Sequence, residues 1–246
     1  MKIPYYILSF LISFIIISCN ENVHFPTGDL TPQQPVKDTI QQHIDSLKKI
    51  CQPGDLVVRL GDDFISDRIR YLSVTDHSYS HAGIIVTRDN KKMVCNIYPD
   101  DFVIGADTVR YDNIDSFLNT KTNLTCALYR YDLSDSEKVN FEEALNNYHK
   151  RKIHFDKKYD LNTDDKIYCS EMIYKALKKI TNNRIVIAKS FVPENMQHLM
   201  FIYFKEYNFS KSIISNRKII ALDNLYNNPH CKQIMKFTLK DMPHNE

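Results

Sequence analysis

Apolar positions in the first half of the chain follow two different periods and predict both helices and strands. Apolar residues recur at helical spacing over Asp38–Ile50, and Pro53-Gly54 ends that helix. A short buried strand is expected at Leu56-Val57-Val58, and a further helix at Phe64–Leu72.

A β-hairpin is predicted around Asp89-Asn90. Ala82–Val86 and Met93–Tyr98 are its two strands. If Asp89-Asn90 is a two-residue turn, Arg88 pairs with Lys91 and Gly83 faces Asn96. Even-numbered residues of the return strand then share the sheet face of His81.

The second half of the chain alternates between strand and helix patterns. Further strands are expected at Val103–Val109, Leu124–Tyr131 and Ile213–Ala221. Three helices are also expected. A capping box at Ser134-x-x-Glu137 begins the first, whose apolar side is Val139, Ala144, Leu145 and Tyr148. The second is Ser170–Ile180, and the third begins at Pro193-Glu194. The chain has too many predicted strands for a helical bundle, and its helices are grouped along the sequence, so the predicted fold class is α+β.

The N-terminus has the pattern of an export signal. Lys2 precedes the apolar run Tyr5–Ile17, which is short for a membrane span, and Ser18-Cys19 follows at once. This arrangement resembles a bacterial lipobox with Cys19 as the lipidated residue, and the alternative is a plain signal anchor with an incidental cysteine. The expected organisation is a signal peptide at 1–18, a lipidated cysteine and tether at 19–37, and one domain with a C-terminal extension at 38–246.

Composition narrows the classes of function. Hydrophobic residues make up 43% and charged residues 25%, enough for a folded core, and the formal net charge of +2 gives no strong field for nucleic acid. No CxxC, zinc spacing, calcium loop or nucleotide-binding motif occurs, so neither metal nor cofactor is expected. The oligomeric state is not readable from the sequence. Besides Cys19 there are five cysteines, an odd number that leaves at least one thiol unpaired in an exported protein: Cys51, Cys95, Cys126, Cys169 and Cys231.

Cys169 stands where a polar stretch gives way to an amphipathic helix. The dipole and free N–H groups of a helix start lower a thiol pKa and can hold an oxyanion, so this position suits a nucleophile. The alternative is a structural cysteine buried at the same helix start.

His81 is the candidate base, because a nucleophilic thiol needs a proton acceptor within hydrogen-bond reach. Asn96, the diagonal neighbour of His81 in the predicted hairpin, is the candidate that orients its ring. The alternatives are a satisfied histidine and an ordinary polar residue at the ends of two strands.

Three segments together resemble the YiiX/YebB-like group of NlpC-type cysteine hydrolases, a circularly permuted branch of the papain-like superfamily. They are Gly54-Asp55-Leu56, Ser80-His81-Ala82-Gly83-Ile84 and Tyr168-Cys169-Ser170-Glu171. The permuted group orders its residues as histidine, polar residue and cysteine, which is the order of His81, Asn96 and Cys169. The resemblance spans about residues 50 to 200.

The resemblance implies an antiparallel sheet or partial barrel packed against the helix that begins at Cys169. It also implies a thiol hydrolase in which Cys169 attacks a carbonyl, His81 carries the proton and Asn96 fixes the imidazole. Four residues in or beside the motifs are candidates for the substrate pocket, although both tyrosines also fit a core: Tyr168, Tyr79, Ser80 and Asp55.

The expected substrate is a peptide or amino-acid amide of the cell envelope, because an exported lipoprotein would face the envelope on its outer-membrane or periplasmic side. Two alternatives stay open. One is a hydrolase or acyltransferase acting on lipid acyl groups with the same fold, and the other is a non-catalytic envelope lipoprotein that only binds its ligand.

Overall fold

The computed structural model describes residues 36–99, 107–203 and 209–240. The predicted signal peptide, the lipobox at Cys19 and almost all of the tether lie outside these residues. In the described part of the chain, no helix is both long and apolar enough to cross a bilayer.

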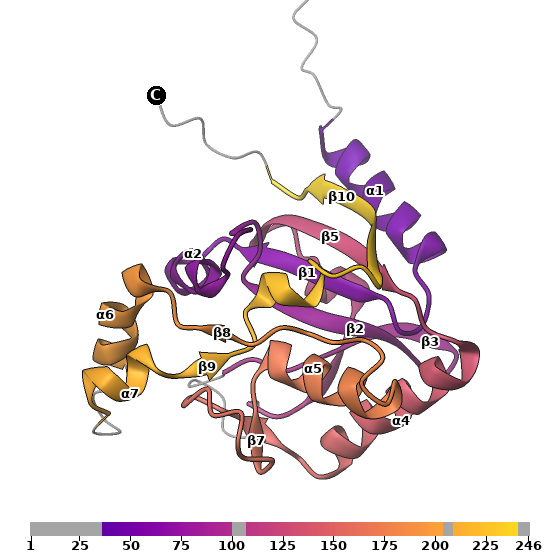
Figure 1. The fold of residues 1–246 in the computed structure, drawn as a ribbon. Helices are drawn as coiled ribbons and strands as arrows, with labels where there is room; N and C mark the ends of the chain where they lie inside the picture. Colours follow the sequence, from indigo (N-terminus) through magenta and orange to yellow (C-terminus); the bar gives the residue numbers. More distant parts are fainter. Residues whose placement is uncertain (1–35, 100–106, 204–208, 241–246) are drawn as a thin grey trace, which may run out of the picture. The chain divides into compact units, whose positions relative to one another are not determined.

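One six-stranded antiparallel sheet organises the described residues, with strand order β10-β5-β1-β2-β3-β4 (Figure 1). Its strands are β1 (Leu56–Gly61), β2 (His81–Arg88), β3 (Lys91–Asn96), β4 (Arg110–Asn113), β5 (Asn123–Tyr131) and β10 (Cys231–Thr238). The predicted α+β class with an antiparallel sheet is therefore confirmed.

Helices cover both faces of this sheet. The main ones are α1 (Val36–Ile50), α3 (Ile114–Phe117), α4 (Asp135–Lys150) and α5 (Cys169–Ile180). Even-numbered β2 residues such as Ile84 pack in the core formed with α4 and α5, whereas odd-numbered ones such as Ile85 pack in the core formed with α1 and α3. A strand that alternates between two apolar layers explains why β1 and β2 read as almost continuous hydrophobic runs.

Smaller elements connect these layers. The helical ones are α2 (Phe64–Ile69), η1 (Arg70–Leu72), α6 (Glu194–Tyr203), α7 (Lys211–Ser215) and η3 (Leu222–Leu225). The short strands form two pairs, β6 (His154–Phe155) with β7 (Lys166–Ile167) and β8 (Ser190–Phe191) with β9 (Lys218–Ile219).

The predicted hairpin register is confirmed. Arg88 pairs with Lys91 across the turn. Asp89 and Asn90 have φ values of 49° and 58°, the left-handed conformation that a tight two-residue hairpin turn requires. This register fixes which face of β3 carries Asn96.

Two strand predictions are wrong in part. Residues 103–106 lie outside the described part of the chain, and the strand that follows is Arg110–Asn113. Ile213–Ala221 begins as helix α7, because the Ser210 hydroxyl caps the Ile213 N–H, and only Lys218–Ile219 is extended.

Two further differences concern apolar residues. Val139 of α4 is 66% exposed, whereas Phe141 is fully buried; two residues turn an α-helix by about 200°, so the two side chains point in opposite directions. Strand β10 was not predicted, since most of its residues are exposed at the sheet edge and its hydrophobic signal is weak.

Candidate active site

His81 is the first residue of β2, and it is buried on the face of the sheet covered by α3. Its Nε2 lies 3.2 Å from Oδ1 of Asn96 in β3. The hairpin register predicted this diagonal contact, and the structure brings the two side chains together.

The other end of the Asn96 amide decides which histidine nitrogen carries the proton. Asn96 Nδ2 donates to the Val94 carbonyl at 3.2 Å and to the Asp112 carboxylate at 3.0 Å. Both partners are acceptors, so Oδ1 must face His81 and Nε2 must be the donor. In neutral His81 the basic nitrogen is therefore Nδ1.

Charged and aromatic groups hold this arrangement in place. Asp112 also pairs with Arg110, at 2.8 Å, which balances its charge. The Tyr98 ring lies edge-on to the His81 ring, with centroids 5.7 Å apart. The Arg110 guanidinium stacks on the face of the Tyr98 ring, 4.7 Å from its centroid. The imidazole is thus fixed by a hydrogen bond and by ring contacts.

Gly83 leaves the space that Asn96 occupies. A Cβ at Gly83 would lie 3.2 Å from Asn96 Cβ and would overlap a methyl group of Val94. A glycine in this strand thus permits the close approach of β3 side chains.

Cys169 is the first residue of α5, and Tyr168 is its N-cap. The backbone amide of Ala82, the residue next to His81, lowers the pKa of the Cys169 thiol. The amides of Ser170 and Cys169 also stabilise the thiolate. Among the described cysteines, Cys169 alone is partly exposed, while Cys51, Cys95, Cys126 and Cys231 are buried.

Burial shifts the pKa values of the Cys169 thiol and the His81 imidazole in opposite directions, each toward the neutral form. Burial raises the pKa of Cys169 to about 11, although the surrounding amides and Arg59 lower it. Burial and the charge of Arg59 lower the pKa of His81 to about 3, although Asn96 raises it. These shifts favour the thiol form of Cys169 and the neutral form of His81 at pH 7.

Hydrogen bonds around the first turn of α5 position Cys169. The Tyr168 N–H donates to Glu171 at 3.3 Å, and Lys175 pairs with the same carboxylate at 2.8 Å. The Ser170 hydroxyl donates to the Ile220 carbonyl at 2.7 Å, and the Ile220 N–H donates to the Tyr168 hydroxyl at 2.8 Å. Sequence reasoning missed this support, because Lys175 and Ile220 lie outside the motif.

The four predicted pocket residues have structural partners in this fold. The Asp55 carboxylate is buried against Arg130, and the Ser80 hydroxyl accepts the Gly61 N–H at 3.2 Å. Tyr79 is fully buried and lies edge-on to Tyr226, and Tyr168 is buried under Ile220. Their pocket roles gain no support from these contacts, and a place in the core fits both tyrosines.

Arg59 is a residue that the sequence analysis did not single out. It lies in β1 directly opposite His81, and its guanidinium stacks on Phe117 at 4.9 Å. The signal was present as a lone arginine within an otherwise apolar strand that begins at Leu56 of the first motif segment. Its place beside His81 became visible only with the pairing of β1 and β2.

Comparison with protein families identifies the group to which this site belongs. Residues 50–235 match the model of the permuted papain-like amidase enzymes, YaeF/YiiX, C92 family. The chain belongs to this family. It is accordingly a member of a cysteine hydrolase family, and the match covers the helix start at Cys169 and both hairpin strands.

A solved structure supports the same fold for this C92 family member. The crystal structure of the metalloprotein yiiX from Escherichia coli O157:H7 superposes with a TM-score of 0.59 at 19% sequence identity. The match covers 76% of this chain and 97% of the other. A comparison with curated proteins found no match.

Metal-binding side chains do not cluster in the described residues, where no group of three or more His, Cys, Asp and Glu side chains could hold an ion. The expectation that the reaction needs neither metal nor cofactor stays a prediction. Thiol hydrolysis can proceed with groups of the protein alone.

Proposed function

We propose that this C92 family member hydrolyses an amide bond of a peptide or amino-acid amide, with Cys169 as nucleophile, His81 as base and Asn96 as the residue that orients His81. The observation that carries this proposal is the hydrogen bond of Asn96 to Nε2, which leaves Nδ1 as the basic nitrogen. The amide of Ala82, the residue next to His81, lowers the pKa of the Cys169 thiol, which supports a proton transfer between Cys169 and His81.

The reaction follows from the neutral resting pair. His81 Nδ1 takes the thiol proton as Sγ attacks the carbonyl carbon, and the developing oxyanion lies near the first amides of α5. The imidazolium then gives its proton to the leaving amine, and a thioester remains on Cys169. A water molecule then attacks the thioester carbonyl and gives a proton to His81 Nδ1. The C–S bond breaks, the imidazolium returns that proton to Sγ, and the acyl group leaves as a carboxylic acid.

The test compares wild-type protein with Cys169→Ala on a panel of peptide amides, amino-acid amides and lipid acyl esters. We expect amide hydrolysis that Cys169→Ala abolishes, with unchanged folding by circular dichroism. Cys231→Ala, which removes a buried thiol, is the matched control and keeps its activity. Turnover of the lipid esters alone would contradict the amide assignment, and ligand binding without any turnover would favour a non-catalytic protein.

Thiol labelling provides an independent test. Cys169 should react first with iodoacetamide at pH 7, because it is partly exposed and burial raises the pKa of Cys231 further, to about 12. Peptide mapping after short labelling times measures the order. Equal labelling of Cys169 and the buried cysteines would contradict a reactive role for Cys169.

We also propose that lipid on Cys19 anchors the enzyme to the cell envelope, which places its substrate there. The apolar run Tyr5–Ile17 followed by Ser18-Cys19 supports this proposal. Cys19→Ala should release the protein from the membrane fraction, whereas Cys51→Ala should not. Retention of the Cys19→Ala protein in that fraction would indicate an uncleaved signal anchor.

A further inference from the structure

Arg59 is a cation that lies beside the proposed base. It is the cross-strand partner of His81, and its guanidinium packs 4.9 Å from the centre of the Phe117 ring. The His81 ring lies 5.6 Å from the same ring centre. Arginine and histidine therefore share one aromatic support on one face of the sheet.

The hydrogen bonds of Arg59 leave one end of its guanidinium unused. Nη1 donates to the Asn123 side chain. Nε is enclosed and has no acceptor among the described residues. Nη2 is not enclosed, and no described residue accepts a hydrogen bond from it. A terminal nitrogen of the guanidinium is thus open to a ligand.

Carboxylates near Arg59 are already engaged elsewhere. Asp112 pairs with Arg110 and accepts from Asn96. Asp63 accepts the backbone N–H and the hydroxyl of Ser66 at the start of α2. No carboxylate of the described residues lies within 4.0 Å of the guanidinium.

A partly buried cation without a counter-ion is unfavourable, because lost hydration is not repaid by a partner. Burial accordingly lowers the pKa of Arg59. A bound anion would supply the missing charge and a charge-assisted hydrogen bond. It would also oppose the field with which Arg59 lowers the pKa of His81, so the bound complex would hold a stronger base.

We propose that Arg59 determines specificity by binding a carboxylate of the substrate through its open terminal nitrogen, so that the enzyme prefers amides carrying a free carboxylate near the scissile bond. This inference rests on the proposed roles of Cys169 and His81. The carboxylate can lie on the amine side or on the acyl side of the scissile amide, and both are tested.

The experiment uses matched substrates that differ only in one charge. Acetyl-alanyl-alanine carries the carboxylate on the amine side, and glutaryl-p-nitroanilide carries it on the acyl side; each is compared with its carboxamide. We expect wild-type kcat/KM to favour the carboxylate form of at least one pair by about 10- to 100-fold, the range of hydrogen bonds to charged groups.

Variants then assign this preference to Arg59. Arg59→Gln should remove the preference by lowering kcat/KM for the carboxylate form by a larger factor than for the carboxamide. Arg59→Lys keeps the charge but not the planar fork, so it should retain part of the preference. Equal loss on both members of a pair would point to oxyanion stabilisation or to a structural role, and would overturn the proposal.

Binding separates failure of this inference from failure of the proposed function. Calorimetry on Cys169→Ala protein, with and without Arg59→Gln, measures affinity for the same pairs without turnover. Carboxylate binding that depends on Arg59 would support the inference even if no amide were cleaved. Hydrolysis dependent on Cys169 with no carboxylate preference would overturn it and leave the proposed function intact.

Discussion

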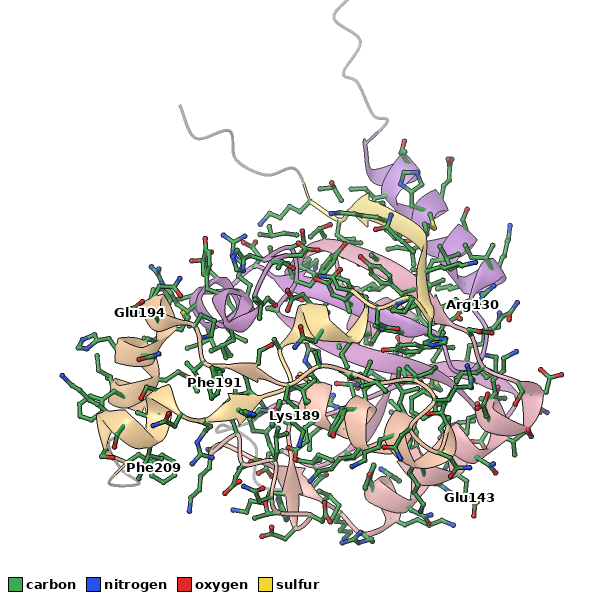
Figure 2. The ribbon with its side chains drawn as sticks, viewed as in Figure 1. Arg130, Glu143, Lys189, Phe191, Glu194 and Phe209 are labelled. Carbon is green, nitrogen blue, oxygen red and sulfur yellow. The ribbon has the colours of Figure 1, made fainter. Side chains whose placement is uncertain are left out.

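Arg130 and Arg59 lie on neighbouring strands of one sheet, and their guanidinium groups have opposite surroundings. Arg130 contacts both carboxylate oxygens of Asp55 at 2.8 Å and the Ile50 carbonyl at 2.9 Å. Arg130 is labelled at the right of Figure 2, while α2, which follows the other end of β1, is labelled at the left of Figure 1. Arg59 lies near that other end and has Asn123 and Phe117 as its contacts instead of a carboxylate.

The difference separates a charge with a structural partner from one that we propose binds the substrate. Asp55 raises the pKa of Arg130 through its hydrogen bonds and also accepts the Gln52 N–H, so the pair ties the end of α1 to the sheet. Burial lowers the pKa of Arg59, and the charges of Asp112 and Asp63, neither of them in an ion pair with Arg59, offset this only in part. An uncompensated charge beside a buried histidine is the combination expected at a functional site.

Removing the base should have the largest effect. His81→Gln should lower kcat by about 10³-fold, because the thiol keeps its proton when no acceptor is present. Initial rates on the preferred amide measure this loss. His198→Gln, at an exposed position of α6, is the control and should leave kcat unchanged. Full activity of His81→Gln would show that His81 is not the base, and Arg59 would then have no catalytic group beside it.

Replacing the two arginines should affect stability in opposite ways. Arg130→Met leaves buried Asp55 unpaired and should lower the free energy of unfolding by about 3 kcal/mol. Arg59→Met removes an unpaired cation and should leave that free energy unchanged or raise it. Urea denaturation of both variants measures the contrast. A large loss with Arg59→Met would show that Arg59 stabilises the fold as Arg130 does.

Asn96→Ala should have a smaller catalytic effect. Loss of the hydrogen bond to Nε2 frees the imidazole to rotate, so kcat should fall about tenfold with little change in KM. Asn140→Ala, on the surface of α4, is the matched control. A fall confined to KM would assign Asn96 to substrate binding instead of ring orientation.

The pH dependence should show the smallest effect. His81 must be unprotonated to accept the thiol proton, and its pKa of about 3 keeps it so well below the ordinary value of 6.5. Activity should therefore stay level from about pH 8 to pH 5, where a histidine with pKa about 6.5 would already be mostly protonated. A kcat/KM profile that halves near pH 6.5 would contradict this neutral pair.

The lowered pKa of His81 also predicts that the stability of the fold depends on pH. The unfolded chain binds a proton at His81 below about pH 6.5, while the folded protein resists it down to about pH 3. The free energy of unfolding should therefore fall as pH drops through this window. His81→Gln should reduce that slope, and His198→Gln should not.

The sequence alone determined features that depend on neighbours in the chain. A two-residue turn fixes strand parity, so Asp89-Asn90 is sufficient to place Asn96 on the sheet face of His81. The polar-to-amphipathic boundary likewise placed Cys169 at the first residue of a helix. The order of three motifs carried the family resemblance, which the family match confirms.

Only the tertiary structure decided which charges meet. Asp55 belongs to one of the three motifs, yet its partner Arg130 lies 75 residues away, so its structural role is a long-range fact. Arg59 meets His81 because β1 pairs with β2, a contact across a loop that local periodicity does not encode. These non-local contacts bury Cys169 and His81 and place the charge of Arg59 beside them. Burial and this charge shift the pKa values of both groups.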